Sequence, residues 1–253
     1  MGSGGLEVVE GVEALNSSLD GLGFERVKHL PGSTYKDAST IIIVPSKDDR
    51  FYLKVLQSWQ GMIAPMNQKR AFLYCIGDEV GKAYENMIGN ILKDPELSKW
   101  KYVMTLESDN IQPADAHIRL LETIEAGNYD AVSGIYFTKG EVNMPMAYGD
   151  PAEFQRSGHL DFKPRDIRAA LQHGHVMDVN GIAMGCSLYR LDLFREIPAP
   201  WFVTVSDVIE GKGPMGFTQD LWFCKAAKER GKRFAVDMRV RVGHLDFNTG
   251  IVY

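Results

Sequence analysis

The residues of this sequence best placed to do chemistry are two acids at the end of an apolar run. The segment Tyr102-Val-Met-Thr-Leu-Glu-Ser-Asp-Asn110 begins as a strand and then presents Glu107 and Asp109. Because side chains alternate across a strand, both carboxylates point to the same side. Open parallel sheets bind ligands at the carboxyl ends of their strands, and carboxylates there suit Mg²⁺ or Mn²⁺. The alternative is an acidic loop before a helix that starts near Pro113.

A third acid, Asp220, stands at the head of a helical pattern. It shares one stripe with Phe223, Cys224 and Ala227, at the spacing i, i+3, i+4, i+7. Burial would raise the pKa of this acid and the positive end of the helix would lower it, so we expect a carboxylate that is ionised but poorly solvated. Such a group suits a general base. The alternative is an acid that only satisfies free N–H groups in the first helical turn.

Histidines supply a further candidate ligand. His244 ends the strand-like run Arg239-Val-Arg-Val-Gly-His-Leu245, and histidine is a common metal ligand. Taken alone, a histidine at a strand end is more often a surface residue, so its interpretation depends on the order of motifs described below. His173 and His175 form an H-x-H pair without an acid or cysteine nearby to complete a zinc pattern, and we interpret them as loop residues or acceptor contacts.

The elements that must position these residues follow from the alternation of short apolar runs with longer segments of helical period, which is typical of βαβ units on a mainly parallel sheet. Strands are expected at about 40–44, 70–76, 102–106, 131–136, 181–189 and 234–242. Helices are expected at about 51–59, 80–93, 113–126 and 219–230, the last closed by Gly231 in a left-handed cap. We therefore expect an α/β fold.

Domain organisation follows from the same pattern. Residues 1–39 are interpreted as an N-terminal extension of unknown role with a possible amphipathic helix, and residues 40–253 as one domain. A polar insertion at about 138–176 interrupts the alternation, and a long loop of this kind is usually functional. The insertion could form an acceptor site.

Composition excludes several classes of function. Of the 253 residues, 45% are apolar and 24% charged, and the net charge of -5 argues against a nucleic-acid partner held by phosphate contacts. Cys75, Cys186 and Cys224 lie far apart in apolar sequence, so we expect reduced thiols and a reducing, cytoplasmic compartment. No apolar run reaches the ~20 residues of a membrane span, and no secretion signal is recognisable.

The order of these motifs resembles the GT-A glycosyltransferases, especially the family 2-like group, over about residues 40–245. Val44-Pro45 resembles the opening strand and turn of that family, and Ala83-Tyr-Glu-Asn86 stands where many members carry an Arg-Asn pair. Gly181-Ile-Ala-Met-Gly185, Leu188-Tyr-Arg190 and Pro198-Ala-Pro-Trp-Phe202 are similar to the segments that precede the acidic helix. The resemblance implies a GT-A fold, a Rossmann-like and mainly parallel sheet flanked by helices.

The activity implied by the resemblance is a hexosyltransferase-like glycosyltransferase, which moves a sugar from a nucleoside diphosphate sugar, most simply UDP- or GDP-linked, to an acceptor hydroxyl with Mn²⁺ or Mg²⁺. The DXD motif of the family reads Glu107-Ser-Asp109 here, so Asp109 would bind the metal and Glu107 the ribose or a metal-bound water. His244 would complete the metal site, and Asp220 would be the base of an inverting reaction. Gln219 stands where many inverting members carry an acid, which leaves a retaining mechanism open.

For the nucleotide, the resemblance points to the turn at Pro45 and Ser46 and to Asp78, which would bond the base. Lys82 would face a phosphate. The alternative is that Gly77-Asp78 is an ordinary turn and Lys82 a solvated lysine. Trp201 and Phe202 are expected either to stack on an acceptor sugar or to be core residues.

Two other classes of protein remain as alternatives. A sugar nucleotidyltransferase would carry a Gly-rich phosphate loop after the first strand, whereas Pro45-Ser-Lys-Asp-Asp-Arg50 has no glycine. A catalytically silent glycan- or partner-binding module would keep the fold without the chemistry. The presence of Asp109, Asp220 and His244 together argues against the silent module.

Overall fold

A mixed sheet of seven strands forms the centre of the described part of the chain, in the order β2-β1-β3-β9-β5-β12-β7. The computed structural model describes residues 37–172, 174–209 and 213–253, and Asp37–Tyr253 form one unit. The strands are β1 (Thr40–Ser46), β2 (Arg70–Ile76), β3 (Tyr102–Leu106), β5 (Ala131–Ile135), β7 (Val176–Val179), β9 (Cys186–Arg190) and β12 (Phe234–Arg241). The amphipathic helix expected within residues 6–39 falls almost wholly outside the described residues, as does His173.

The direction of the strands is mainly parallel, as the sequence predicts. β1 pairs in parallel with β2 and β3, and β5 pairs in parallel with β12. β9 lies antiparallel between β3 and β5, and β7 is antiparallel to β12 at the sheet edge. The carboxyl ends of β1, β2 and β3 therefore meet at one edge of the sheet, where ligands of such sheets bind.

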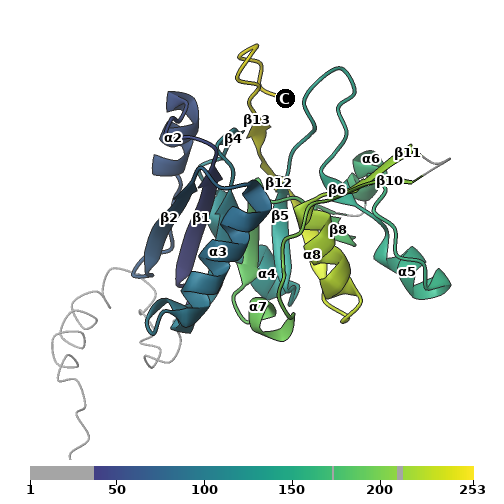
Figure 1. Cartoon of the computed structure of the whole chain (residues 1–253), viewed down its shortest axis with the longest axis horizontal. Helices are drawn as coiled ribbons and strands as arrows, with labels where there is room; N and C mark the ends of the chain where they lie inside the picture. The colour runs from purple at the N-terminus through teal and green to yellow at the C-terminus, as the bar shows by residue number, and fades with distance from the viewer. Residues whose placement is uncertain (1–36, 173, 210–212) are drawn as a thin grey trace, which may run out of the picture. The chain divides into compact units, whose positions relative to one another are not determined.

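Helices cover both faces of the sheet because each buried strand is apolar on both sides. In β1, Ile41 and Ile43 join the cluster under α3 (Val80–Lys93) and α8 (Gln219–Lys228). Ile42 and Val44 join the opposite cluster under α2 (Leu53–Gln60) and α4 (Ala116–Ala126). Figure 1 shows α3 and α8 on the near face and α4 behind the sheet. This arrangement of helices on both faces of a sheet confirms the expected α/β class.

Short elements fill the connections, and most of them were not predicted from the sequence. They are β4 (Asn110–Ile111), β6 (Ala147–Tyr148), α5 (Pro151–Ser157), α6 (Ile167–Leu171), β8 (Gly181–Ile182), α7 (Leu193–Glu196), β10 (Val205–Ile209), β11 (Gly213–Phe217), β13 (Gly243–His244) and a 3₁₀ turn at Leu97–Lys99. The insertion at 138–176 is therefore not a bare loop, because it contains β6, α5 and α6.

The strand expected at 181–189 is wrong in one respect, because it is divided into β8 and β9. Gly185 lies at the break, where its N–H donates to the Tyr136 hydroxyl at 2.9 Å and its carbonyl accepts from Gln112 at 3.1 Å. A Cβ on Gly185 would come within 2.3 Å of Asn110 Oδ1. This close approach lets the chain leave β6, the partner of β8, and enter the central sheet as β9.

An irregularity in β12 directs the end of that strand toward the strand-end acids. The register with β5 shifts between Asp237 and Arg241. Asp237 is fully buried there, accepting hydrogen bonds from Arg239 and, at 2.6 Å, from Thr123 Oγ1. Beyond the shift, β13 pairs with β4, which places His244 opposite Asn110. Such irregularities re-aim side chains near functional sites.

Other expectations about the core can be compared directly with the structure. Trp201 and Phe202 are 9% and 5% exposed and belong to the cluster under α3 and α8, so the core interpretation holds for both. Gly231 follows α8 with φ +75°, as the cap requires. All three cysteines are free thiols. Among the described residues, no helix is long and apolar enough to cross a membrane.

Candidate functional site

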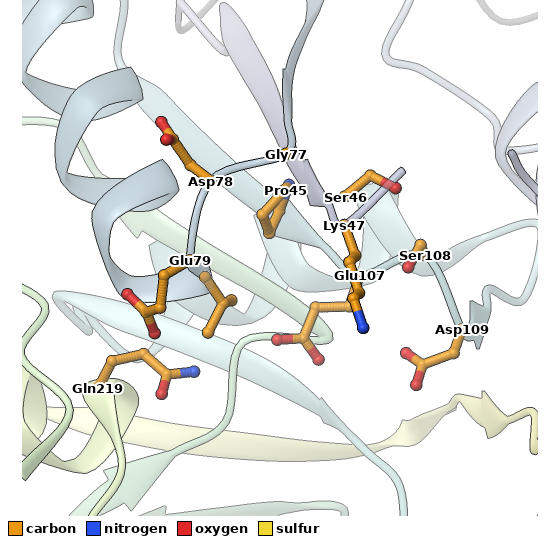
Figure 2. Close-up of a pocket in the computed structure, with 11 residues that line it drawn as sticks. Pro45, Ser46, Lys47, Gly77, Asp78, Glu79, Glu107, Ser108, Asp109 and Gln219 are labelled. Carbon is orange, nitrogen blue, oxygen red and sulfur yellow. The ribbon is translucent and has the colours of Figure 1, made fainter. Parts of the chain in front are cut away.

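A cleft of about 580 Å³ opens at the carboxyl ends of β1, β2 and β3. It is lined by Pro45, Ser46, Lys47, Gly77, Asp78, Glu79, Val80, Glu107, Ser108, Asp109 and Gln219. Figure 2 shows Glu107 between Asp109 on one side and Glu79 and Gln219 on the other. Four carboxyl groups and one lysine among these residues make the lining acidic.

The ends of β1 and β2 are joined by backbone contacts that shape one wall of the cleft. The Gly77 N–H donates to the Ser46 carbonyl at 2.9 Å. Gly77 has φ +86°, a left-handed conformation that glycine adopts without strain, and it turns the chain from β2 toward α3. The predicted nucleotide residues Pro45, Ser46 and Asp78 therefore line one cleft.

Asp78 and Lys82 differ in their position. Asp78 accepts hydrogen bonds from Cys75 Sγ and Asn86 Nδ2, and these contacts, with the Lys82 ammonium at 3.5 Å, lower the pKa of its carboxyl. Its ionised oxygens are available to donors in the cleft. Lys82 lies outside the cleft lining, and its side chain is 67% exposed. Its proximity to a phosphate is therefore not supported by the geometry.

The positive end of α3 faces the cleft but is occupied by its own acid. Glu79 is the N-cap of α3 and accepts from the Lys82 N–H at 2.9 Å. Burial raises the pKa of Glu79, but hydrogen bonds from the backbone of Lys82 and Gly81 outweigh this effect and leave its pKa lowered. Because this carboxylate already satisfies the helix end, α3 does not offer a free anion site.

Glu107 is held in an unfavourable place for a charge. Burial, together with the negative charges of Asp109 and Asp220, raises its pKa to about 8. The carboxyl group is therefore mostly protonated at neutral pH in the protein without ligands. A cation bound beside it would favour the ionised form, so Glu107 is suited to respond to one.

Asp109 is the centre of a polar group that joins three segments. Burial raises the pKa of Asp109, but His244 and Lys139 outweigh it and leave the pKa lowered. Its Oδ2 accepts from Lys139 Nζ at 2.5 Å and lies 3.4 Å from His244 Nε2. Its carbonyl accepts from the Leu245 N–H at 2.8 Å. The sequence contained no sign of Lys139, which reaches Asp109 from the loop between β5 and β6.

The orientation of His244 leaves its second nitrogen facing an acid. His244 Nδ1 lies 2.7 Å from the Phe137 carbonyl, which can only accept, so Nδ1 carries the proton of the neutral ring. Nε2 faces Asp109 Oδ2 at 3.4 Å, and the hydrogen bond and charge of His244 lower the pKa of that carboxyl. A divalent cation bound between them would replace the Nε2 proton and take one imidazole nitrogen and one carboxylate oxygen as ligands.

Asp220 lies behind the cleft. It is 8% exposed and is absent from the lining, where the preceding Gln219 appears instead. Its Oδ1 accepts from the Leu221 N–H at 2.9 Å, and burial raises its pKa. Its charge contributes to the raised pKa of Glu107. The structure therefore places Asp220 near the strand-end acids, one layer deeper than a lining residue.

The metal site predicted from Glu107, Asp109 and His244 is only partly assembled. No group of three or more histidine, cysteine or acidic residues is arranged to hold a metal in the part of the chain that the structure describes. Asp109 and His244 form a pair of one hard oxygen and one imidazole nitrogen. This donor set fits Mg²⁺ or Mn²⁺ when substrate phosphates and water supply the remaining ligands.

Several lining residues were not singled out from the sequence. Each of them lies within two residues of a predicted site residue: they are Lys47, Glu79, Val80, Ser108 and Gln219. Lys47 directly follows Pro45 and Ser46, so its position was a usable signal, although these two residues end β1 and do not form the expected turn. His175 is exposed, and its carbonyl accepts from the Met238 N–H at 2.8 Å, which is consistent with a loop residue.

Comparison with known proteins gives a fold but no family. No protein-family model and no curated protein sequence matches this chain. Among solved structures, A197 from STIV is similar with a TM-score of 0.53 and 15% identity, over 82% of this chain and 86% of that one. Residues 1–349 of TarS from S. aureus, in complex with UDP-GlcNAc, give a TM-score of 0.48 and 10% identity, over 78% of this chain and 55% of that one. The likeness to A197 concerns the fold alone.

Proposed function

We propose that this chain is a metal-dependent glycosyltransferase of the GT-A type, which transfers a sugar from a nucleoside diphosphate sugar to an acceptor hydroxyl. The observation that carries the proposal is the cleft at the ends of β1, β2 and β3, with the Asp109–His244 pair at its border. The order of motifs resembles that group, and the cleft collects the nucleotide residues expected from it: Pro45, Ser46, Asp78 and Glu107.

The charge of the cleft supports a requirement for metal. The ionised carboxylates of Asp78, Glu79 and Asp109 outnumber Lys47 in the lining, whereas Glu107 is mostly protonated in the absence of ligands. A diphosphate entering this cleft would meet like charge in a site of reduced dielectric, where repulsion costs several times more than in water. A divalent cation held by Asp109 would offset this repulsion.

Asp109 and His244 are the residues that would hold the cation. A bound Mn²⁺ or Mg²⁺ would stabilise the negative charge that develops on the departing nucleoside diphosphate. Glu107 would contact the ribose or a water of the metal, because its partly exposed carboxyl lines the cleft beside Asp109.

Asp78 would select the base. Its carboxylate is ionised, since its hydrogen bonds and Lys82 lower its pKa, and it lies at the wall formed by β2 and α3. An ionised carboxylate accepts hydrogen bonds from the ring N–H group that uracil and guanine both present, and from the amino group of guanine. We therefore expect a UDP- or GDP-linked donor.

Asp220 would take the proton of the acceptor. In the reaction the acceptor oxygen forms the new glycosidic bond, its proton passes to Asp220 and the bond from the sugar carbon to the phosphate oxygen breaks. Burial raises the pKa of Asp220, which makes its carboxylate a stronger base. Inversion at the sugar carbon follows from this single displacement.

The test is thermal stabilisation of the full chain by UDP, GDP, ADP, CDP and dTDP, each with and without Mn²⁺. A ligand at ~100 times its Kd stabilises a protein by about 2.7 kcal/mol, which is measurable as a rise in Tm. We expect UDP or GDP to stabilise only with Mn²⁺, and we expect Asp109→Asn to abolish this effect.

The matched control is Asp115→Asn, which changes an acid that pairs with Arg119 outside the cleft. It should respond to the nucleotide as the unmodified chain does. Absence of any metal-dependent stabilisation by all five diphosphates would reject the proposal in favour of a catalytically silent fold.

A further inference from the structure

Lys139 occupies the position beside Asp109 that a metal ion would need, and its contacts indicate what it does when a metal binds. Its ammonium donates to Asp109 Oδ2 at 2.5 Å, the same oxygen that faces His244 Nε2 at 3.4 Å. The carboxylate of Asp109 is therefore already neutralised by a cation that belongs to the protein, the ammonium of Lys139.

The loop that carries Lys139 also fixes the other metal candidate. The loop closes with hydrogen bonds from Thr138 N–H to the Met144 carbonyl and from Met146 N–H to the Tyr136 carbonyl, both 2.9 Å. Phe137, two residues before Lys139, accepts from His244 Nδ1 at 2.7 Å. One loop therefore orients His244 and delivers Lys139 to its partner acid.

The C-terminal segment contacts the Lys139 side chain through an aromatic ring. Lys139 Nζ lies 5.6 Å from the centre of the Phe247 ring, a cation–π distance. The Phe247 ring stacks on Tyr52 with centroids 4.2 Å apart, and the Tyr52 hydroxyl donates to the Phe247 carbonyl at 3.1 Å. In Figure 1 the loop between β5 and β6 rises beside the segment that follows β13, as the Lys139–Phe247 contact requires.

We propose that Lys139 is a built-in counter-ion of Asp109, which a divalent metal displaces and which then pairs with the phosphates of the bound nucleotide. The proposal rests on the glycosyltransferase function above and adds a positioning residue to that site. Asp109 Oδ2 cannot both bind a metal closely and keep the ammonium, because the two cations would repel one another at that distance.

The displaced ammonium has a suitable destination. Lysine carries a compact charge on a flexible four-carbon stem and binds phosphate as a point charge. Asp109 borders the cleft, so an ammonium released from it remains beside the diphosphate. Metal binding alone loses the Lys139–Asp109 pair, whereas metal with nucleotide replaces it by a lysine–phosphate pair. Metal and nucleotide should therefore favour each other's binding.

The experiment measures binding, and it uses the full chain freed of metal with chelator. Mn²⁺ alone is titrated into the unmodified chain and into Lys139→Met, Lys139→Arg and Lys163→Met by calorimetry; UDP and GDP are then titrated at saturating Mn²⁺. We expect Lys139→Met to bind Mn²⁺ about tenfold tighter or more, because no ammonium has to be displaced, and to bind the nucleotide at least about fivefold weaker.

The two controls separate the charge from the position. Lys139→Arg keeps a cation at Asp109 and should bind Mn²⁺ as weakly as the unmodified chain. Lys163→Met removes an exposed lysine of the same insertion and should change neither affinity. Lys139→Gln repeats the test if Lys139→Met proves unstable.

Opposite changes in the two affinities would support the proposal. Equal or weaker Mn²⁺ binding by Lys139→Met overturns it, while metal-dependent nucleotide binding by the unmodified chain would still uphold the function. Nucleotide binding without metal that is lost in Lys139→Met also overturns it, because Lys139 would then be the resident cation. If no variant binds Mn²⁺ or nucleotide, the proposed function itself fails.

Discussion

At the scale of single residues, the two strand-end acids have opposite effects on stability. For Glu107, burial and the charges of Asp109 and Asp220 outweigh the charge of Lys139, whereas Asp109 is hydrogen-bonded by Lys139 and faces His244. The sequence predicts that both point one way, and both line one cleft. Their environments differ because the partners of Asp109 come from residues 139 and 244, far along the chain.

We expect Glu107→Gln to stabilise the ligand-free protein by on the order of 2 kcal/mol at pH 7.5, because it removes a partly buried acid beside two negative charges. Urea denaturation of the ligand-free chain measures the change. Asp109→Asn should act in the other direction, by about 1–2 kcal/mol, because it weakens charge-assisted contacts. Equal effects of both substitutions would contradict the assigned environments.

His117 gives a stability that depends on pH. It is 1% exposed; Thr40 Oγ1 donates to the Ala38 carbonyl and so accepts from His117 Nε2 at 3.0 Å. Its Nδ1 is buried without a partner among the described residues. Protonation would bury an unpaired N–H and a charge, so burial lowers the pKa of His117 to about 4.

The unfolded chain binds this proton near pH 6.5 and the folded chain only near pH 4, so the free energy of unfolding falls as pH falls through that window. The loss from this residue should approach about 3 kcal/mol at pH 4 and be absent above pH 7. His117→Gln should remove this part of the pH dependence in denaturation curves from pH 4 to 7. A curve parallel to that of the unmodified chain would contradict it.

At the scale of elements, the irregular part of β12 is a support for His244. Arg239 satisfies the carboxylate of Asp237, whose side chain is 0% exposed, while Arg239 itself is 32% exposed. Burial raises the pKa of Asp237, but Arg239 and Thr123 outweigh it and leave the pKa lowered. Removing the arginine therefore leaves a buried negative charge.

We expect Arg239→Met to destabilise the protein by about 3–5 kcal/mol, the usual loss when one partner of a buried ion pair is removed. Asp237→Asn should cost less, because the remaining arginine can turn toward solvent. Chemical denaturation of both variants checks the order. If Asp237→Asn lowers the free energy of unfolding more than Arg239→Met does, the loss is not caused by an unpaired buried charge.

The type and bounds of an element were predicted where a single apolar periodicity determines them. The direction of a strand within the sheet was not. The strand at 70–76 and the helix at 80–93 have the predicted bounds, because each is a regular apolar pattern between turn residues. The antiparallel direction of β9 was not predicted, since an apolar run reads the same in both directions. The contact of His244 with Asp109 depends on the β12 register shift, which no local pattern reveals.

At the scale of the whole molecule, residues distant in the sequence make the site jointly. Asp109 follows β3, Lys139 lies between β5 and β6, and His244 follows β12. The segment after His244 returns to it, with the His244 N–H donating to the Tyr253 carbonyl at 2.9 Å and the Tyr253 N–H donating back at 3.0 Å. The resemblance in motif order predicted Asp109 and His244, but a lysine from an irregular insertion carries no such order.

Deletion of residues 246–253 should therefore weaken Mn²⁺ binding about tenfold while lowering Tm only slightly. It removes the backbone partners of His244 and the Phe247 ring, but it spares the two clusters that cover the sheet. Calorimetry with Mn²⁺ and a thermal melt measure the two effects. A large loss of Tm would mean that this segment supports the fold as a whole.

The antiparallel strand β9 also has a consequence for the order of folding. Its residues, Cys186–Arg190, pair with both β3 and β5, which do not pair with each other. As the chain leaves the ribosome, β1, β2 and β3 can assemble early, but β5 has no neighbour in the sheet until β9 has emerged. Long-range strand pairing of this kind is slow. We therefore expect the early sheet of β1, β2 and β3 to keep one edge unpaired until the later strands join it.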